Sequence, residues 1–514
     1  MGSSDEAKPA DVATADLDLE VQVGQTLDVS DGPAQDGFSG KLRAFIKTIG
    51  AEEHGIERIP EDLRTNQPPR DLATLFLSAN FNTATLALGY LGPTLYGLGW
   101  WDSFLAVLFF NVVGGVFPAI AAAFGPKLGL RTMVIPRYCF GWWGAKILAV
   151  LNVINQIGWG IVNGISGAAV LYDAGDGHLP LTVAVLVVGL VAIIFGIFGY
   201  RMVHIYDRYS WYVMLVCFIF VAGFGARHFV NVPMGTGPVE ASNLLSFGTT
   251  IIGFQAAWLP VAADYGVYMR PDIKARSSFG WAYAGLLSSQ LLVELLGVGL
   301  GTLSQSSNPL FQDAYTDRGI GGLIGAVFQE NGPHALAFGR FIEVLLGFST
   351  AAVITTNIYS LGLSVQMISV KLLVIPRLVW TLIGSAVFLA CAIAGRDHLV
   401  EVMDNFLLIC AYWIVPFLTI FLAEHFLWRR DFDYDPTAWN DRTKLPYGFA
   451  ATFTWFVCTT ISVLCMSQTW WVGPIAAGIG GSEAGTDISW ILSLVVGVIL
   501  YIPLRMWERK IWHL

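Results

Sequence analysis

Apolar stretches of about 20 residues, the length that crosses ~30 Å of hydrocarbon as an α-helix, recur about a dozen times between residues 72 and 504. Charged residues make up only 13% of the chain, whereas an ordinary soluble domain carries roughly 25%. A soluble fold has too little interior to bury this much apolar surface. We therefore predict an all-α polytopic membrane protein.

The distribution of Lys and Arg supports a count of twelve spans, because these residues are retained on the cytoplasmic side of a membrane. With a cytoplasmic N-terminus, 24 of the 29 Lys and Arg residues fall in inner segments and 3 in outer loops. Both termini are therefore expected to be cytoplasmic. The predicted spans are residues 72–97, 102–124, 142–172, 180–199, 209–226, 247–268, 279–304, 335–369, 376–395, 398–426, 447–469 and 487–506.

Residues 1–70 differ from the rest, with 14 acidic and 7 basic side chains. We expect a largely disordered cytoplasmic tail, with a short ordered piece near 56-IERIPEDLR-64. The loop 304–334, rich in glycine, is expected to form an outer cap.

The third span carries amides where a helix that faces lipid would carry aliphatic residues. Asn155, Trp159 and Asn163 are four residues apart, so they share one helical face, and Asn152 and Gln156 lie beside it. Such amides can join helices by hydrogen bonds, which is our interpretation of Asn152 and Asn155. Trp159 and Asn163 fit a functional role better, because an indole can stack on a flat solute while an amide binds its edge.

Two other spans are interrupted. The first contains 78-SANFNTATLALGYLGP-93, and the sixth places Gln255 and Trp258 between Gly253 and Pro260. Proline removes a helical donor and disturbs the preceding turn. Interrupted helices at matching places in two halves of a chain point to a transporter site at the bilayer midplane.

The eighth span contributes Thr355, Thr356 and Asn357. At 1.5 Å per residue, Trp159, Trp258 and Asn357 reach a similar depth near the middle of the membrane. They are predicted to converge on one small pocket.

Several blocks occur in a characteristic order along the chain. They are 54-HGIERIPEDLRTN-66, SANFN and LGYLGP in the first span, 137-RYCFGWWG-144, 258-WLPVAADYGVYM-269 and 423-AEHFLWRRDFDYDPTAWNDRTKLPYGFAA-451. Together these blocks resemble the fungal purine-cytosine permeases of the nucleobase-cation symporter family. The resemblance implies a five-plus-five inverted-repeat fold of the leucine-transporter type with two additional C-terminal helices, and import of a nucleobase together with a cation.

The resemblance also implies a division of the chain and a set of site residues. The division is a tail (1–71), a ten-helix transport core (72–426), a cytoplasmic loop (427–446) and two further helices with a short cytoplasmic C-terminus (447–514). Trp159 and Trp258 match the family's stacking tryptophans, and Asn163 and Asn357 match its polar residues that face the base. Further candidates for substrate binding are Thr85, Gln255 and Thr356.

The chain departs from the family pattern in the eighth span, where it reads 353-VITTN-357 in place of the more usual NNIPN. Lost amides mean lost recognition of a substrate edge. Cytosine and purine nucleobases remain the expected substrates, and pyridoxine or another small heteroaromatic solute is the alternative.

Protons are the expected coupling ion. Members of the family driven by sodium resemble one another in a Ser-Thr pair where this chain has Ala351 and Ala352, and hard cations require oxygen ligands. Glu294 is our candidate proton carrier, and Asp264 our candidate gating residue. Glu343 is expected to form an ion pair with Arg340.

Other classes of function are less well supported. The eight histidines lie in loops or at helix ends without metal-ligand spacing, and we find no phosphate-binding loop or GxSxG motif, so we expect neither an enzyme nor a bound cofactor or metal. A channel or a nutrient receptor remains the alternative to a transporter. We expect a protein of the plasma membrane that contacts lipid and a small solute and binds no nucleic acid; its oligomeric state is left open.

Overall fold

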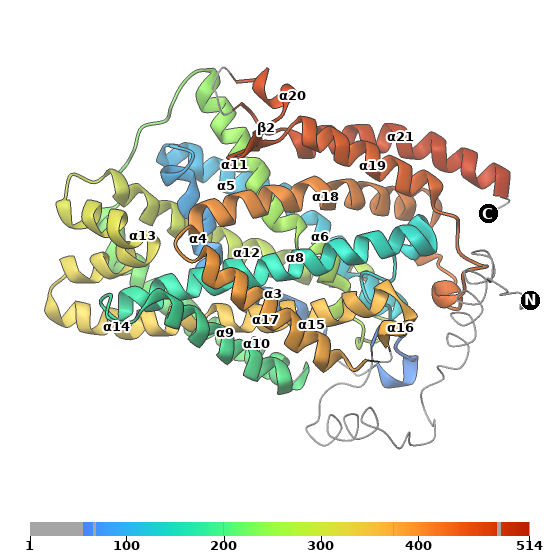
Figure 1. The fold of residues 1–514 in the computed structure, drawn as a ribbon, viewed down its shortest axis with the longest axis horizontal. Helices are drawn as coiled ribbons and strands as arrows, with labels where there is room; N and C mark the ends of the chain where they lie inside the picture. Colours follow the sequence, from blue (N-terminus) through green and yellow to red (C-terminus); the bar gives the residue numbers. More distant parts are fainter. Residues whose placement is uncertain (1–54, 65–67, 199, 374, 481–484, 513–514) are drawn as a thin grey trace, which may run out of the picture.

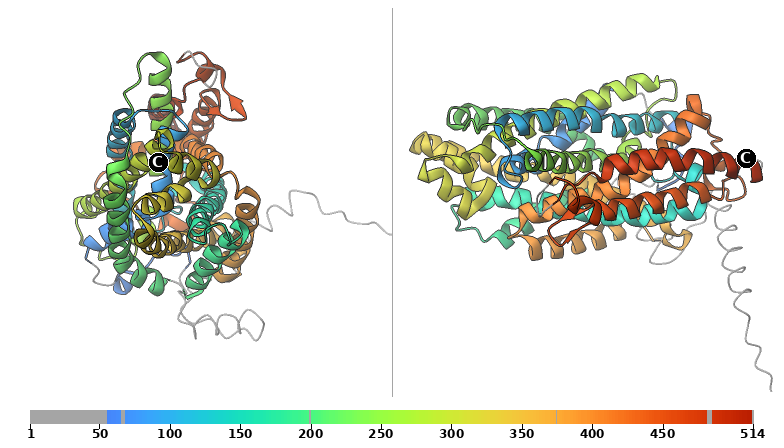
Figure 2. Two further views of the ribbon diagram at one scale, coloured as in Figure 1. Left: turned by 90° about the vertical axis from the view of Figure 1, so that its left-hand side faces the viewer. Right: turned by 90° about the horizontal axis from the view of Figure 1, so that it is seen from above.

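Long helices run side by side along the longest axis of the molecule and form an elongated bundle (Figures 1 and 2). This computed structural model describes residues 55–64, 68–198, 200–373, 375–480 and 485–512. Within these ranges, nine helical segments are long and apolar enough to cross a membrane. They are Trp100–Leu128, Arg137–Ala174, Tyr209–His228, Pro238–Tyr265, Ala275–Gln305, Pro333–Ile368, Arg377–Gly395, Leu399–Trp428 and Ser489–Trp512.

Shorter apolar helices cover Leu181–Gly196 and Phe449–Leu464. Large apolar side chains such as Phe109, Ile154 and Ile219 are exposed on the outside of the bundle. A lipid-facing surface explains this exposure, because apolar side chains lose nothing by facing hydrocarbon chains.

The first predicted span is two helices rather than one. Helix α3 (Arg70–Asn80) ends within the polar stretch 78-SANFN-82, and α4 (Thr83–Thr94) begins directly after this stretch. The Asn82 side chain caps α4, because its Oδ1 accepts a hydrogen bond from the Thr85 backbone N–H at 2.9 Å. The predicted interruption is therefore confirmed.

The sixth span is interrupted as well. Helix α11 (Pro238–Ala256) ends just before Trp258, and the chain continues as the 3₁₀ helix η3 (Leu259–Tyr265). Pro260 occupies the first turn of η3, where its missing N–H costs nothing. This interruption is confirmed near the predicted proline.

The remaining elements include helices in each of the other predicted spans, but α10 starts at Tyr200 rather than 209 and the predicted span 335–369 is divided into two helices at Ser349. They are α5 (Trp100–Gly114), α6 (Val116–Ala122), α7 (Phe124–Leu128), α8 (Arg137–Ala174), α9 (Leu181–Phe198), α10 (Tyr200–Gly225), α12 (Ala275–Thr302), α13 (Pro309–Glu330), α14 (Pro333–Phe348), α15 (Thr350–Ile368), α16 (Val370–Leu373), α17 (Arg377–Gly395), α18 (Leu399–Trp428), α19 (Phe449–Leu464), α20 (Pro474–Ala477) and α21 (Ser489–Trp512). Two-residue strands, β1 (Ser467–Gln468) and β2 (Trp471–Val472), pair between α19 and α20.

The region 304–334, expected to be a loop, is instead mostly helix α13 with a kink at Gly319. Its apolar residues Ile320, Leu323 and Val327 are buried, which explains why a glycine-rich sequence is helical here. Midway along the next helix, α14, Arg340 Nη1 lies 2.9 Å from Glu343 Oε2, so the expected ion pair is present.

Helix α12 packs against both halves of the interrupted first helix without space for side chains between the backbones. A Cβ at Gly285 would lie 2.6 Å from the carbonyl oxygen of Ala73 in α3. A Cβ at Gly89 in α4 would lie 1.8 Å from the carbonyl oxygen of Glu294. Only glycine permits such close approach.

Residues 55–64, where a short ordered piece was predicted, lie against the C-terminal end of α7. Ile59 is fully buried and its N–H bonds the Gly129 carbonyl at 2.9 Å. The buried Arg64 guanidinium donates to the carbonyl oxygens of Ile59, Pro126 and Leu128 at 3.1 to 3.2 Å. The rest of the predicted disordered tail, residues 1–54, falls outside the described residues.

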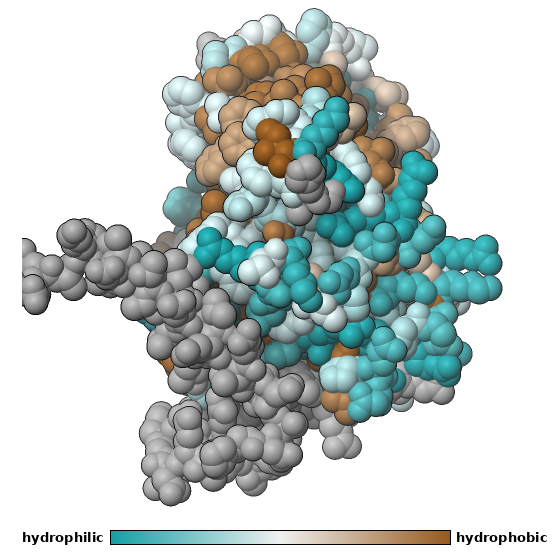
Figure 3. Space-filling view, turned by 90° about the vertical axis from the view of Figure 1, so that its right-hand side faces the viewer, coloured by the Kyte–Doolittle hydropathy of each residue, from teal (hydrophilic) through white to brown (hydrophobic). Residues whose placement is uncertain are grey.

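The end of the bundle reached by the C-terminal part of α21 carries many hydrophilic side chains (Figure 3). The loop that follows α18 adds the exposed residues Arg430, Asp435 and Lys444. Within the bundle, α21 is bound to α18 by Arg505, whose Nη2 lies 2.7 Å from Glu424 Oε1.

Candidate functional site

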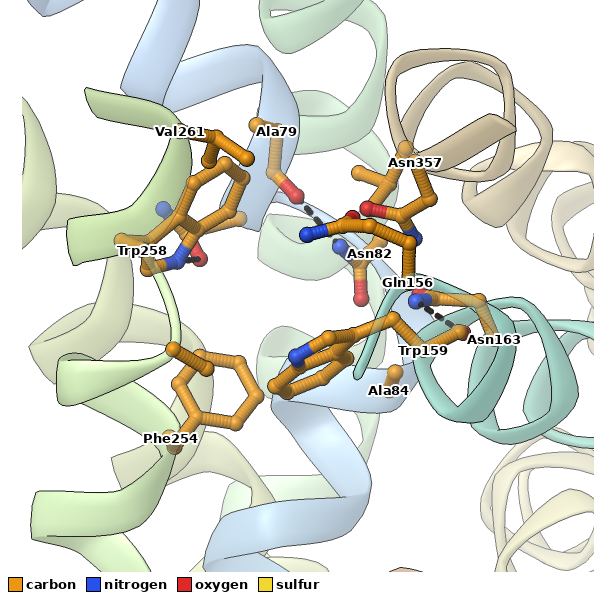
Figure 4. A pocket seen from close by; sticks show the side chains of 13 residues that line it. Ala79, Asn82, Ala84, Gln156, Trp159, Asn163, Phe254, Trp258, Val261 and Asn357 are labelled. Carbon is orange, nitrogen blue, oxygen red and sulfur yellow. Dashed lines mark hydrogen bonds between the residues drawn. The ribbon is translucent and has the colours of Figure 1, made fainter. Parts of the chain in front are cut away.

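A cavity lies where the two interrupted helices meet α8 and α15 (Figure 4). Every side chain that lines it is uncharged, and the set mixes amides, aromatic rings and small aliphatic groups. The lining residues are Ala79, Asn80, Asn82, Ala84, Gln156, Trp159, Asn163, Phe254, Ala257, Trp258, Val261, Val353 and Asn357. Such a cavity suits a small, neutral solute with an aromatic face and polar edges.

The two tryptophans lie on different sides of this cavity (Figure 4). Trp159 contacts Phe254 and Phe406, with centroid separations of 5.1 and 5.3 Å and nearly perpendicular ring planes. Trp258 meets Phe76 in the same way at 5.5 Å. Perpendicular ring contacts of this kind hold each indole in place, and both indoles line the cavity.

Asn163 and Asn357 each present an unsatisfied polar atom. Asn163 Nδ2 donates to the Trp159 carbonyl at 2.8 Å, so the orientation of this amide is fixed and its Oδ1 is the free atom. Among the described residues, neither Asn163 Oδ1 nor Asn357 Nδ2 has a hydrogen-bond partner, although both atoms are buried. Buried polar atoms without partners cost free energy, and a ligand with a donor and an acceptor would satisfy both.

The structure therefore brings together the four residues that match the family's site, namely Trp159, Asn163, Trp258 and Asn357. It also adds Asn80 and Asn82, which were noted as a polar cluster but were not predicted to line a site. Asn80 Oδ1 accepts a hydrogen bond from the Trp258 indole N–H at 3.3 Å. The signal that could have identified them is the interruption itself, because the residues at a helix break face the cavity that the break forms.

The other three substrate candidates do not line the cavity. Gln255 is fully buried and its Nε2 donates to Asn111 Oδ1 at 2.7 Å. Thr356 Oγ1 donates to the Val353 carbonyl at 2.8 Å, and Thr85 belongs to the cap of α4. Each is a sequence neighbour of a lining residue, and the helical rotation of about 100° per residue turns it away.

Glu294 and Asp264 also lie outside the cavity wall. Glu294 is fully buried in α12 and its Oε2 accepts from Asn111 Nδ2 at 2.6 Å. Because Asn111 accepts in turn from Gln255, a buried chain of side chains runs from Glu294 to α11, two residues from the break. Asp264 in η3 accepts from the backbone N–H and the hydroxyl of Thr132 at 2.6 and 3.1 Å, which ties η3 to the segment between α7 and α8.

No cluster of three or more His, Cys, Asp or Glu side chains suited to a metal ion occurs in the part of the chain that the structure describes. At the start of α15, the Ser349 hydroxyl donates to the Leu346 carbonyl at 2.5 Å and accepts from Thr83 N–H at 3.2 Å. This hydroxyl is therefore engaged in joining α4 to α15.

Membrane-length helices that enclose an aromatic and amide-lined cavity between two interrupted helices define a membrane transporter. Residues 58–492 match the family of permeases for cytosine/purines, uracil, thiamine and allantoin. The chain belongs to this family, whose members are multi-pass transporters and not enzymes.

Relatives in sequence and structure agree with this assignment. The chain is 36% identical to purine-cytosine permease fcyB of Emericella nidulans over 92% of each chain. It is 29% identical to vitamin B6 transporter TPN1 of Saccharomyces cerevisiae over 91% of this chain and 89% of the relative. Its fold is similar to that of Mhp1, a nucleobase-cation-symport-1 family transporter solved closed with bromovinylhydantoin bound, with a TM-score of 0.67, 15% identity and coverage of 89% of this chain and 96% of Mhp1.

Proposed function

We propose that this protein imports cytosine and purine nucleobases by alternating access around the cavity between the two interrupted helices. The observation that carries the proposal is the pair of unpartnered atoms, Asn163 Oδ1 as acceptor and Asn357 Nδ2 as donor, beside two indole rings. A nucleobase offers a flat face for the rings and adjacent N–H and acceptor groups for the amides. The relation to purine-cytosine permeases supports the same substrate class.

The proposed topology has twelve membrane passages, with the first ten forming two inverted halves of five. Both termini lie in the cytoplasm, so the hydrophilic end of the bundle is the inner end and α13 covers the outer end. The plasma membrane is the proposed location. The excess of Lys and Arg in the predicted inner segments and the similarity to Mhp1 support this arrangement.

Protons are the proposed coupling ion, and Glu294 is the proposed carrier. A hard cation needs several oxygen ligands. Ala351 and Ala352 offer no side-chain oxygen, and the Ser349 hydroxyl is engaged by backbone groups. Thr350 Oγ1 is buried without a partner among the described residues, but one hydroxyl does not make a sodium site. Asp264 is proposed to act in gating, because it ties η3 to the segment between α7 and α8.

A second candidate substrate is pyridoxine or a similar heteroaromatic vitamin. Val353 lines the cavity at a position where the family pattern has an asparagine, so this part of the wall is less polar than in purine-cytosine permeases. The similarity to a vitamin B6 transporter points the same way.

Uptake of radiolabelled cytosine at pH 5 and pH 7.5 tests the proposal, in cells that lack their own carriers. We expect saturable uptake that is faster at pH 5 and inhibited by excess adenine. Asn163→Ala and Asn357→Ala should each raise KM about tenfold, the cost of one lost hydrogen bond in a buried site. Asn405→Ala, at an exposed amide that bonds Thr469, is the control.

The result against the proposal is absent cytosine uptake by protein that reaches the cell surface. Saturable pyridoxine uptake under the same conditions would then establish the second candidate.

A further inference from the structure

Gln156 is a lining residue to which the family pattern assigned no role. It is 2% exposed and lies in the cavity wall on α8. Its Nε2 donates to Asn152 Oδ1 at 3.0 Å. Among the described residues, no donor bonds its Oε1, and Figure 4 shows the Gln156 amide across the cavity from Trp258.

A chain of amides holds Gln156 in this orientation. Asn152 Nδ2 donates to the Ser364 hydroxyl on α15 at 2.8 Å. Asn152 Oδ1 then receives both Gln156 Nε2 and, at 3.4 Å, Asn155 Nδ2. Because Cys410 Sγ donates to Asn155 Oδ1 at 3.1 Å, the donors and acceptors are consistent along the chain. The carbonyl oxygen of Gln156 is therefore the atom left for a ligand.

Gln156 and Asn163 lie on opposite sides of Trp159 along the same helix. They are seven residues apart, which is about two turns or ~10 Å along the axis. Both are left with a carbonyl oxygen that has no donor among the described residues. A solute that stacks on Trp159 thus meets a hydrogen-bond acceptor at each of two edges.

We propose that Gln156 is a further specificity-determining residue, accepting a hydrogen bond from an N–H on the substrate edge remote from Asn163. Asn152 acts as a positioning residue, because it orients the Gln156 amide without reaching the cavity wall. The inference rests on the proposed function and narrows the substrate class. Favoured solutes are flat heterocycles with N–H groups on two separate edges, as in cytosine and adenine.

Competition for labelled cytosine uptake tests this inference with two pairs of solutes, each pair differing by one lost N–H site. The pairs are cytosine with 1-methylcytosine, which lacks the ring N–H, and adenine with purine, which lacks the exocyclic amino group. In the unchanged protein, the member without the N–H should inhibit about tenfold more weakly in both pairs.

Gln156→Met keeps the side-chain volume and removes the acceptor. We expect it to raise KM for cytosine about tenfold with little change in the maximal rate. Gln156→Met should also abolish the difference in inhibition within one of the two solute pairs and leave the difference within the second pair unchanged. Asn163→Ala should instead abolish the difference within the second pair. Gln156→Asn, whose amide is one methylene shorter, should behave in the same way and replaces Gln156→Met if that variant does not reach the surface. Gln312→Met on α13 is the matched control.

Two substitutions of Asn152 test its role as a positioning residue, with discrimination within the solute pairs as the measurement. Asn152→Leu should lose the same discrimination as Gln156→Met, whereas Asn152→Asp, which still accepts from Gln156 Nε2, should retain it. If both pairs keep their tenfold differences in Gln156→Met and Gln156→Asn while cytosine uptake continues, the inference is overturned and the proposed function stands. If the unchanged protein takes up no cytosine, the proposed function itself fails.

Discussion

The Trp258 indole donates its N–H to Asn80 Oδ1 at 3.3 Å. Asn80 is the last residue of α3 and Trp258 lies between α11 and η3, so this bond joins the two interrupted helices directly at their breaks. Asn80 Nδ2 donates to the Phe76 carbonyl at 2.9 Å, and the Phe76 ring meets Trp258 edge-on. One helix end thus fixes the ring that forms one side of the cavity.

Asn80→Leu should weaken substrate binding indirectly, because Asn80 lines the cavity but both polar atoms of its amide are engaged, by Trp258 and by the Phe76 carbonyl. The variant keeps a similar volume but removes the acceptor for the indole N–H, so Trp258 loses its fixed orientation. We expect KM for the transported solute to rise about three- to tenfold, in line with one hydrogen bond. Kinetics of uptake at matched surface expression measure the change. Unaltered KM would mean that packing against Phe76 alone orients Trp258.

Gly89→Ala should nearly abolish transport. The added Cβ would lie 1.8 Å from the Glu294 carbonyl oxygen, so α4 and α12 must separate and the buried side chains of Glu294 and Asn111 must shift with them. Overpacking of this kind costs about 1–3 kcal/mol or more. Gly223→Ala, whose Cβ meets nothing within 4 Å, is the control. Thermal stability in detergent and uptake rate are the two measurements, and a Gly89→Ala protein as active as the control would contradict the close packing.

Glu294→Gln should uncouple transport from the proton gradient. The amide carbonyl can still accept from Asn111 Nδ2, so the fold should be retained while the group can no longer release a proton. We expect the variant to lose the faster uptake at pH 5 and to bring the solute only to equal concentration on both sides. Steady-state accumulation at pH 5 and 7.5 is the measurement, with Glu330→Gln at an exposed position as control. Accumulation that persists in Glu294→Gln assigns the proton to another group.

Arg64→Ala should destabilise the end of the bundle where residues 55–64 pack against α7. Removal of the guanidinium leaves the carbonyls of Ile59, Pro126 and Leu128 without this donor, and unsatisfied buried acceptors cost about 1–3 kcal/mol. The partly exposed Arg58 makes one bond to Leu128 O at 2.9 Å, so Arg58→Ala should cost less. The apparent melting temperatures of the purified variants rank the two, and equal values would contradict a special role for Arg64.

Hydropathy predicted most of the apolar helices, because it depends on local sequence and on the membrane alone. Pro260 marked the break in the sixth span, whereas the break in the first span lies at residues 81–82, within its polar residues, and Pro93 lies inside α4. The meeting of Trp159, Trp258 and Asn357 at one level followed from counting residues along three spans. It was harder to predict which side chains of each helix face the cavity, because this depends on the rotation of the helix about its axis. Gln255 and Thr356 are one to three residues from lining positions, yet they point into contacts with Asn111 and Val353.

Long-range packing could not be predicted at all. The sequence of α13 is rich in glycine, and its helix forms because Ile320 and Leu323 are buried against the rest of the bundle. The roles of Asn80 and Gln156 likewise depend on partners in other turns or other helices. A list of polar residues in one span does not reveal which amides satisfy one another and which are left with a free atom.

The close packing along α12 also determines how the first helix can move. The continuous helix α12 contacts α3 at Gly285 and contacts α4 where Gly89 meets Glu294. It therefore packs against the chain on both sides of the break at residues 81–82. This packing couples the two half-helices, because a movement of either one that preserves its contact with α12 must carry α12, and with it the other half. In the alternating access proposed above, α3, α4 and α12 would therefore move as one unit.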